Sequence, residues 1–197
     1  MELLAALQEA GFIGYEDGEG GGWSPEWNVP EDALDALTDA EAFEGLNATV
    51  NLVAMPVGAE DDADMELAFK RVPVSLSPTP NHNPEITGLS VDDVVLEEDE
   101  VLTALAEQTY VIEPMIGDDD VEDYVYLNSD CEEEERTEEP YFSWYATTGS
   151  FDQTFSLYPY TSVEWTPDET AESGQIIVVV RDRRGGMAWS VLPIVVE

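Results

Sequence analysis

The closing stretch, residues 174–197, constrains the fold more than any other part of the chain. Residues 176–180 (IIVVV) are an unbroken β-branched run, RDRRGG is a polar turn that ends in two glycines, and residues 187–196 are a second apolar run. Two such runs around a short glycine-containing turn predict a β-hairpin. A strand with no polar position is usually covered on both faces. The rest of the chain must therefore supply a cover for this hairpin.

The charge balance narrows the classes of partner. The 197 residues include 6 Lys+Arg against 45 Asp+Glu, a formal net charge of −39. Nucleic acids and anionic membranes are bound through basic surface, so we expect neither as a partner. Aromatic and β-branched residues are plentiful, which favours a folded domain with an acidic surface over a disordered chain.

Two explanations of the acidic surface remain open. Hydrated carboxylates suit a protein adapted to high salt, where screening removes their mutual repulsion. The alternative is a surface that binds cations. Acidic residues occur along the whole chain and thin out only in its last hairpin, which favours the adaptation to salt.

Targeting signals and disulfides are not expected. No stretch is long enough to span a bilayer, and residues 1–10 lack the basic start and apolar centre of a signal peptide. Cys131 is the single cysteine, so an internal disulfide is excluded, and its acidic surroundings make it a poor nucleophile.

The first part of the chain combines helix and strand patterns. Residues 2–10 and 30–44 carry helical patterns, separated by a glycine-rich linker. Alternating patterns at 48–55 and 65–76 predict an antiparallel pair of strands. The proline- and asparagine-rich segment 78–84 excludes both helix and strand, and we place a domain boundary there. The expected division is an N-terminal helix with linker, a small α+β segment with a β-hairpin, and a β-rich domain: 1–29, 30–80 and 81–197.

Beyond this boundary, short strand patterns recur about every ten residues, with turn residues between them. YVYLN predicts a short strand, SDCEEEERTEEP predicts a charged loop, and YFSWYAT alternates again with Phe142, Trp144 and Ala146 on one side. The fold class we predict is all-β with minor helix: an immunoglobulin-like antiparallel β-sandwich that follows a smaller segment of helix and strands.

The order of several motifs resembles a known group of proteins. NHNP opens the β-rich part, WYATTG lies in its aromatic strand, and VRDRRGGMAW closes it. This order is similar to the immunoglobulin-like and polycystic-kidney-disease-like modules of predicted surface lipoproteins of myxobacteria. Those proteins carry N-x-N-P, W-x-A-T-x-G and V-x-D-G-R-G-G-x-x-W. The resemblance covers roughly residues 48–197.

The resemblance implies a location and an architecture more than an activity. It implies a module of the cell envelope or the extracellular space, with Trp144 in the core against Val178 and Val180. Two departures stand out. The signal sequence and lipid-bearing cysteine of those proteins are absent, and Arg183 stands where they carry the first glycine of the closing turn.

An acidic loop is the candidate metal site. Asp118, Asp119, Asp120, Glu122 and Asp123 lie close together between two predicted strands, and Glu60, Asp61, Asp62 and Asp64 form a second such loop. Calcium binds six to eight oxygen ligands, which loops of this kind can supply. Neither loop has EF-hand spacing. No cofactor other than calcium is expected.

The sequence has few of the residue types that enzymes use for nucleophilic or acid–base catalysis. The single histidine, His82, lies in the proline-rich segment, where a solvated turn residue is the expected role. No nucleophilic triad, nucleophile elbow or phosphate-binding loop can be assembled. We therefore do not expect an enzyme.

The arginines of the closing turn are the candidate interface. Arg181, Arg183 and Arg184 supply three of the six basic residues. Guanidinium groups pair in bidentate fashion with carboxylates, so the turn could dock on an acidic loop of a neighbouring copy. The alternative is an internal pair with the acidic run 132–139.

These patterns together predict a non-enzymatic structural or adhesive module of a bacterial cell-envelope or extracellular assembly, with a salt-tolerant acidic surface. Its expected partner is protein, including further copies of itself. A calcium-dependent domain that binds a glycan or a protein is the alternative from another class.

Overall fold

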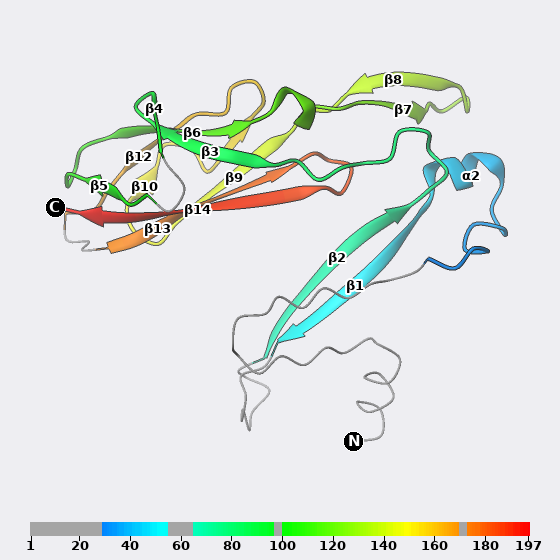
Figure 1. Cartoon of the computed structure of the whole chain (residues 1–197), viewed down its shortest axis with the longest axis horizontal. Coiled ribbons are helices and arrows are strands. Elements are labelled where there is room, and N and C mark those ends of the chain that lie inside the picture. Colours follow the sequence, from blue (N-terminus) through cyan, green and yellow to red (C-terminus); the bar gives the residue numbers. More distant parts are fainter. Residues whose placement is uncertain (1–28, 55–64, 97–99, 170–172) are drawn as a thin grey trace. The chain divides into compact units, whose positions relative to one another are not determined.

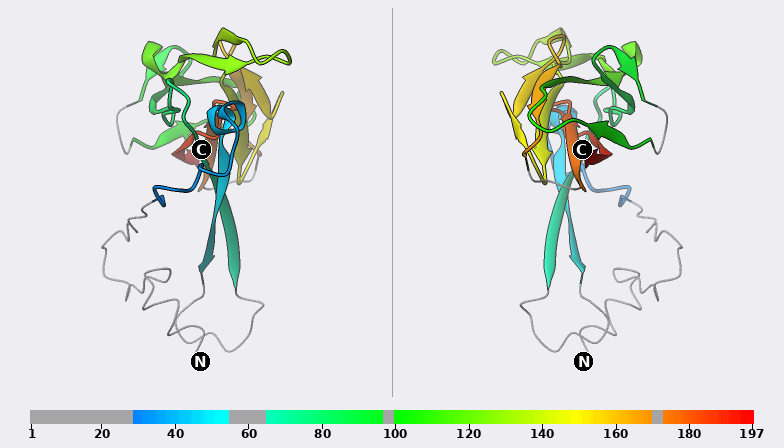
Figure 2. Two further views of the ribbon diagram at one scale, coloured as in Figure 1. Left: turned by 90° about the vertical axis from the view of Figure 1, so that its right-hand side faces the viewer. Right: turned by 90° about the vertical axis from the view of Figure 1, so that its left-hand side faces the viewer.

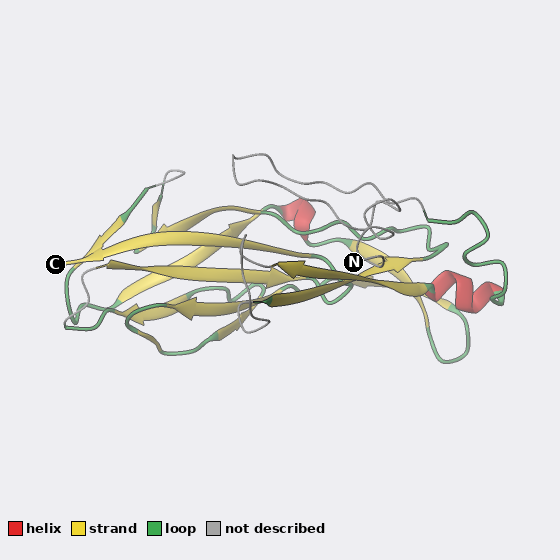
Figure 3. Ribbon diagram, turned by 90° about the horizontal axis from the view of Figure 1, so that it is seen from below, coloured by secondary structure: helices red, strands yellow, loops and turns green. Residues whose placement is uncertain are grey.

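The computed structural model describes residues 29–54, 65–96, 100–169 and 173–197. Strands dominate these residues and their sheets are antiparallel with one exception, so the all-β class is confirmed (Figure 3). Residues 37–197 form one compact unit. The predicted helix at 2–10 and the acidic loop at 60–64 lie outside the described residues.

The predicted helix at 30–44 is confirmed only in its last part, α2 (Asp39–Glu44). Residues 31–36 form turns instead. Thr38 accepts a hydrogen bond from the Glu41 amide, while the Glu41 carboxylate accepts one from the Thr38 amide. This capping box starts a helix at Thr38 rather than at Pro30, which explains why the helix is short.

The predicted antiparallel pair after this helix is confirmed as β1 (Leu46–Ala54) and β2 (Glu66–Val74). Their register runs from Leu46 opposite Val74 to Ala54 opposite Glu66. No third strand joins them among the described residues. The segment that follows β2 is irregular, as its prolines predict.

Two five-stranded sheets make up most of the rest of this unit (Figure 1). The first has the order β10-β12-β6-β3-β4: Ser150–Phe151, Val163–Thr166, Tyr110–Ile116, Ile86–Val91 and Val94–Val95. The second has the order β11-β9-β13-β14-β5: Phe155–Leu157, Tyr141–Ala146, Ser173–Arg181, Met187–Val196 and Leu102–Ala104. The pair β14–β5 is the parallel exception.

One apolar core lies between the two sheets and takes its residues from both of them. Figure 2 shows the green strands of the first sheet on one side and the yellow strand β9 of the second sheet on the other. The predicted hairpin is confirmed: Arg181 of β13 pairs with Met187 of β14. Trp144 is buried in the core opposite Val178, as expected.

The cover expected on both faces of β13 is found on only one of them. Ile176, Val178 and Val180 are fully buried against the other sheet. Ile177 and Val179 alternate with them on the outer face and are only half-buried. An all-apolar strand in this protein therefore marks one buried face and one partly exposed face.

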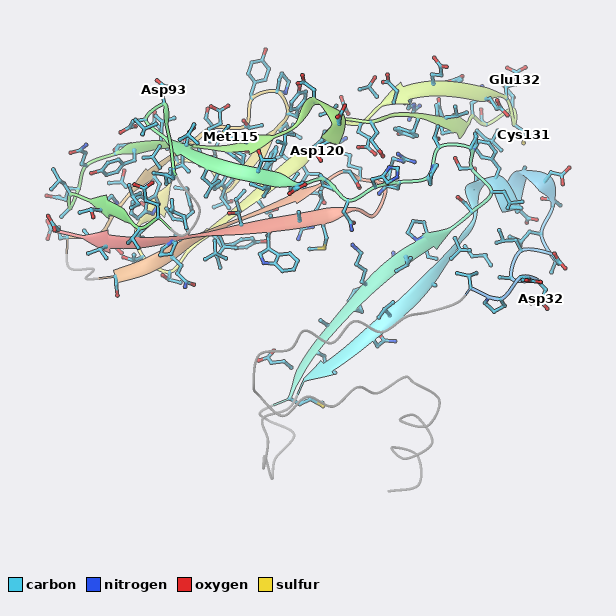
Figure 4. All side chains as sticks on the ribbon, viewed as in Figure 1. Asp32, Asp93, Met115, Asp120, Cys131 and Glu132 are labelled. Atoms are coloured by element: carbon cyan, nitrogen blue, oxygen red, sulfur yellow. The ribbon has the colours of Figure 1, made fainter. Side chains whose placement is uncertain are left out.

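A small hairpin corrects another prediction. The run 129–140 does not form a loop throughout, because β8 (Glu133–Thr137) pairs there with β7 (Asp123–Leu127). Arg136 on β8 stacks over the Tyr126 ring, with its guanidinium 3.8 Å from the ring centroid, and this contact offsets part of the repulsion among the glutamates. Cys131 is exposed at the tip of this hairpin (Figure 4).

Among the described residues, no helix has the length and hydropathy needed to cross a bilayer.

Candidate functional site

The closing turn is built around a buried carboxylate, Asp182, whose residue is 1% exposed. Its Oδ1 accepts hydrogen bonds from the amides of Arg184, Gly185 and Gly186, at 2.7, 3.0 and 2.9 Å. Its Oδ2 accepts one from Asn81 Nδ2 at 2.8 Å. A carboxylate that receives four donors can be buried without the usual penalty for an unpaired charge. Asp182 therefore fixes the turn and joins it to the segment 78–84.

Two positions in the turn have backbone requirements that few residues other than glycine can meet. A Cβ on Gly186 would lie 1.9 Å from Asp182 Oδ2, so only glycine leaves room for the carboxylate. Arg183 has φ 69°, in the left-handed region that favours glycine. Arg183 therefore holds a backbone conformation that glycine adopts more easily than arginine.

Arg184 points into the molecule. Its Nη1 donates to Glu138 Oε1 at 3.0 Å and to Glu122 Oε2 at 3.2 Å, and its Nη2 donates to the Thr79 carbonyl at 2.5 Å. Its guanidinium also lies 4.5 Å from the centroid of the Tyr124 ring. The Arg184 side chain is 15% exposed and that of Glu138 is 1% exposed. Arg184 is thus occupied by internal contacts.

Burial raises the pKa of Glu138 above its ordinary value. The hydrogen bond from Arg184 and the one from the Glu122 amide act in the opposite direction, since both favour the ionised carboxylate. The net direction is upward because the carboxylate loses more hydration than these donors replace.

The other two arginines of the predicted interface lie nearer the surface. Arg183 pairs with Glu139 at 3.2 Å, and both side chains are at least half exposed. Arg181 Nη1 donates to Ser143 Oγ at 3.2 Å. The internal pairing with the acidic run, which the sequence left open, is therefore found for Arg183 and Arg184. Docking of the three arginines on another copy stays a prediction, and among them Arg183 has a side chain that is half exposed.

Basic side chains nevertheless gather beside the turn. A hollow of about 590 Å³ is lined by Lys70, Arg71, Arg181 and Arg183, together with Phe69 and Tyr141. These are four of the six basic residues in the sequence. The one cationic region of the described chain is therefore at this end of the second sheet.

The second sheet presents an outer face with no carboxylate. Its outward positions form rows across the strands, for example Tyr145–Ile177–Val191 and Phe155–Ser143–Val179–Trp189. We call this surface the uncharged face, although it includes Arg181 at its edge. Its outward residues are Phe155 and Leu157; Tyr141, Ser143 and Tyr145; Gln175, Ile177, Val179 and Arg181; Met187, Trp189, Val191, Pro193 and Val195.

Large apolar groups on the uncharged face are open to solvent. Trp189 is 65% exposed, Tyr145 53%, Phe155 48% and Val191 43%. The outer positions of the first sheet differ, because Glu113 and Glu164 stand there among the apolar side chains. An exposed apolar patch on a folded protein marks an interaction surface.

The predicted calcium ligands do not converge. Asp120 accepts hydrogen bonds from the amides of Glu85 and Gly117, and Asp123 accepts one from the Thr137 hydroxyl. Asp118 and Asp119 are exposed in the 3₁₀ turn that ends at Asp120, which Figure 4 shows beside β6. Among the described residues, no group of three or more His, Cys, Asp or Glu side chains is placed to hold a metal ion.

His82 and Glu122 form the remaining contact near this loop. His82 Nδ1 lies 2.5 Å from Glu122 Oε1, and the His82 side chain is 74% exposed. The expected role of His82 as a solvated turn residue agrees with this exposure. Glu122 therefore contacts both His82 and Arg184, which further removes it from a shared metal site.

Comparisons with known proteins add little. No protein-family model and no curated protein matches the sequence. Among solved structures, the chain is similar to a nucleoside hydrolase-related hypothetical protein from Saccharophagus degradans that is associated with carbohydrate metabolism. The match has 17% identity and a TM-score of 0.40, and it covers 60% of this chain and 26% of that chain. The chain thus spans about a quarter of the length of that protein. At this TM-score, neither fold nor activity can be transferred.

The uncharged face was missed by sequence reasoning, although a signal for it exists. Alternate positions of 141–145, 175–181 and 187–195 contain no Asp or Glu, in a sequence with 45 of them. The informative feature is the place where these charges are missing.

Proposed function

We propose that this protein is a non-enzymatic structural module of a bacterial cell-envelope or extracellular assembly, and that it associates with a second copy through the uncharged face. The single observation that carries the proposal is the absence of carboxylates from this face in a chain of net charge −39.

Electrostatics supports a copy of this chain as the partner. Two molecules that each carry −39 repel each other, and burying a carboxylate without a partner costs several kcal/mol. The uncharged face allows two copies to meet without burying any carboxylate of this sheet. Trp189 and Tyr145 provide the aromatic anchors that protein interfaces favour.

The immunoglobulin-like architecture is part of the same proposal. Two β-sheets around one core, with Trp144 buried on a central strand, support it. The resemblance of the closing motifs to predicted surface lipoproteins supports the envelope or extracellular location.

Sedimentation velocity tests the proposal. We expect the wild-type protein to associate as its concentration rises, and more strongly in 1 M KCl, where the Debye length is about 3 Å. Trp189→Thr with Val191→Thr should reduce the association at least about tenfold, because it removes two exposed apolar groups and keeps a strand-forming residue.

The matched control is Val111→Thr with Met115→Thr, two positions on the outer side of β6 with exposures of 44% and 38%. This control should associate like the wild type. A wild-type protein that stays monomeric at every concentration and salt level would overturn the proposal, and so would an equal loss in the control.

A further inference from the structure

We infer that the second copy binds the uncharged face with its β1–β2 hairpin, so that successive copies join head to tail. This inference rests on the proposed function, and it identifies the β1–β2 hairpin as the part of the second copy that binds the uncharged face.

The β1–β2 hairpin is long, and no third strand pairs with it in the part of the chain that the structure describes. Each strand has nine residues. Phe69 is 70% exposed, Leu67 68%, Leu46 45% and Val72 39%. A two-stranded ribbon is only marginally stable in water and needs a third layer or strand against it. Contact with another surface would therefore remove these apolar groups from water and stabilise the hairpin.

The two strands of the hairpin are poor in acidic residues. Residues 46–54 and 66–74 contain one acidic residue, Glu66, and two basic ones, Lys70 and Arg71. The other acidic residues of this segment lie in the connection between the strands, where Glu60, Asp61, Asp62 and Asp64 bring residues 46–74 to a net charge of −3. The strands therefore set only one carboxylate against the uncharged face, which receives their apolar side chains at short range.

The dimensions of the two surfaces also match. β2 and β13 both have nine residues, which at about 3.3 Å per residue corresponds to about 30 Å of strand. Sheets stack face to face at a spacing of about 10 Å. The edge strands β11 and β5 have three residues each, so strand addition there would form few hydrogen bonds. The face of the sheet, rather than its edge, offers the hairpin the larger contact.

The mode of assembly follows from the two different surfaces. A contact between the hairpin of one copy and the face of the next is heterologous, and it leaves a free hairpin at one end and a free face at the other. Such a contact extends into a chain or closes into a ring. A contact of face with face, or of hairpin with hairpin, stops at a dimer.

A mixing experiment distinguishes these modes. The face variant is Trp189→Thr with Val191→Thr, and the hairpin variant is Leu67→Thr with Phe69→Thr. Each variant keeps one intact surface. We expect each to be monomeric alone and their equimolar mixture to form a one-to-one complex in sedimentation, in 1 M KCl with a reducing agent for Cys131.

Three other outcomes would reject the inference. In one of them the proposed function stands, and in the other two it fails as well. If the hairpin variant alone still forms dimers, faces bind faces: the inference fails and the proposed function stands. If the face variant alone still assembles, hairpins bind hairpins, and both the inference and the role of the face fail. If the wild type never associates, both fail as well.

Cross-linking keeps the inference testable if a threonine variant disturbs folding. Copies with Leu67→Cys and copies with Val191→Cys, both in a Cys131→Ser background, are mixed under mild oxidation. A disulfide-linked pair of different copies is expected. Val111→Cys in place of Val191→Cys should give none, and equal yields for the two would contradict the inference.

Discussion

At the scale of single residues, Glu138 is the most informative titratable group. Its side chain is buried beside Arg184, and burial raises its pKa above the ordinary value. The folded state therefore holds this proton more tightly than the unfolded state. The stability that Glu138 contributes is present below the unfolded pKa, near 4.5, and is lost as the pH rises through the folded pKa.

Glu138→Gln should accordingly become more stable relative to the wild type as the pH rises from 4.5 towards neutrality. Each unit by which the folded pKa exceeds the unfolded one corresponds to about 1.4 kcal/mol. Urea midpoints of both proteins across this pH range measure the difference. A difference between Glu138→Gln and the wild type that stays flat across this pH range would contradict the assignment.

Some residue roles could be predicted from the sequence and others could not. The alternation of YFSWYAT places Trp144 in the core correctly, because a strand exposes every second side chain to one environment. The roles of Arg184 and Asp182 depend on Asn81, Thr79 and Glu138, which are distant in sequence. No local pattern encodes such contacts.

At the scale of elements, Arg184 holds four segments together: the β13–β14 turn, the segment 78–84, the start of β7, and the residues just before β9. Arg184→Met should destabilise the protein by about 3–5 kcal/mol, because it leaves Glu138 buried without its cation. Urea denaturation measures this loss. Arg183→Met, which breaks only an exposed pair, should cost about 1 kcal/mol or less.

A second substitution gives an internal check. Adding Glu138→Gln to Arg184→Met should recover part of the lost stability, since the buried charge is then removed. Equal costs for Arg184→Met and Arg183→Met would show that the turn does not depend on the internal contacts of Arg184.

The elements themselves were predictable to different degrees. The closing hairpin and the β1–β2 pair follow from alternation and turn residues. β8 was not predicted because a run of glutamates is typical of a loop. Its pairing with β7 brings Arg136 over the ring of Tyr126, a contact between strands that no local pattern encodes. The helix at 30–44 was predicted too long because the capping box of Thr38 and Glu41 outweighs the proline signal.

At the scale of the whole molecule, the acidic surface governs stability. We expect molar KCl to raise the melting temperature by roughly 4–8 °C, equivalent to about 2 kcal/mol, because screening weakens the repulsion among carboxylates. Melting curves in EDTA, in millimolar calcium and in molar KCl measure this effect. A large rise specific to calcium would favour the calcium-dependent binding domain instead, and no response to any salt would contradict both explanations of the acids.

The recurring strand patterns predicted the all-β class and the composition predicted the acidic surface, but neither could place the surface that carries the proposed function. The uncharged face exists only when β9, β11, β13 and β14 lie side by side in the observed register. Its residues come from three separate parts of the sequence, and sheet pairing over such distances is set by the whole fold.

The β7–β8 hairpin carries the one thiol of the chain at its exposed tip. A maleimide fluorophore or a spin label would attach at Cys131 alone, with no substitution in the native sequence. Labelled copies mixed with unlabelled ones would report by energy transfer or dipolar coupling how far apart neighbouring tips lie. The chain therefore includes its own reporter, and the spacing of that reporter would give the repeat distance of any assembly it forms.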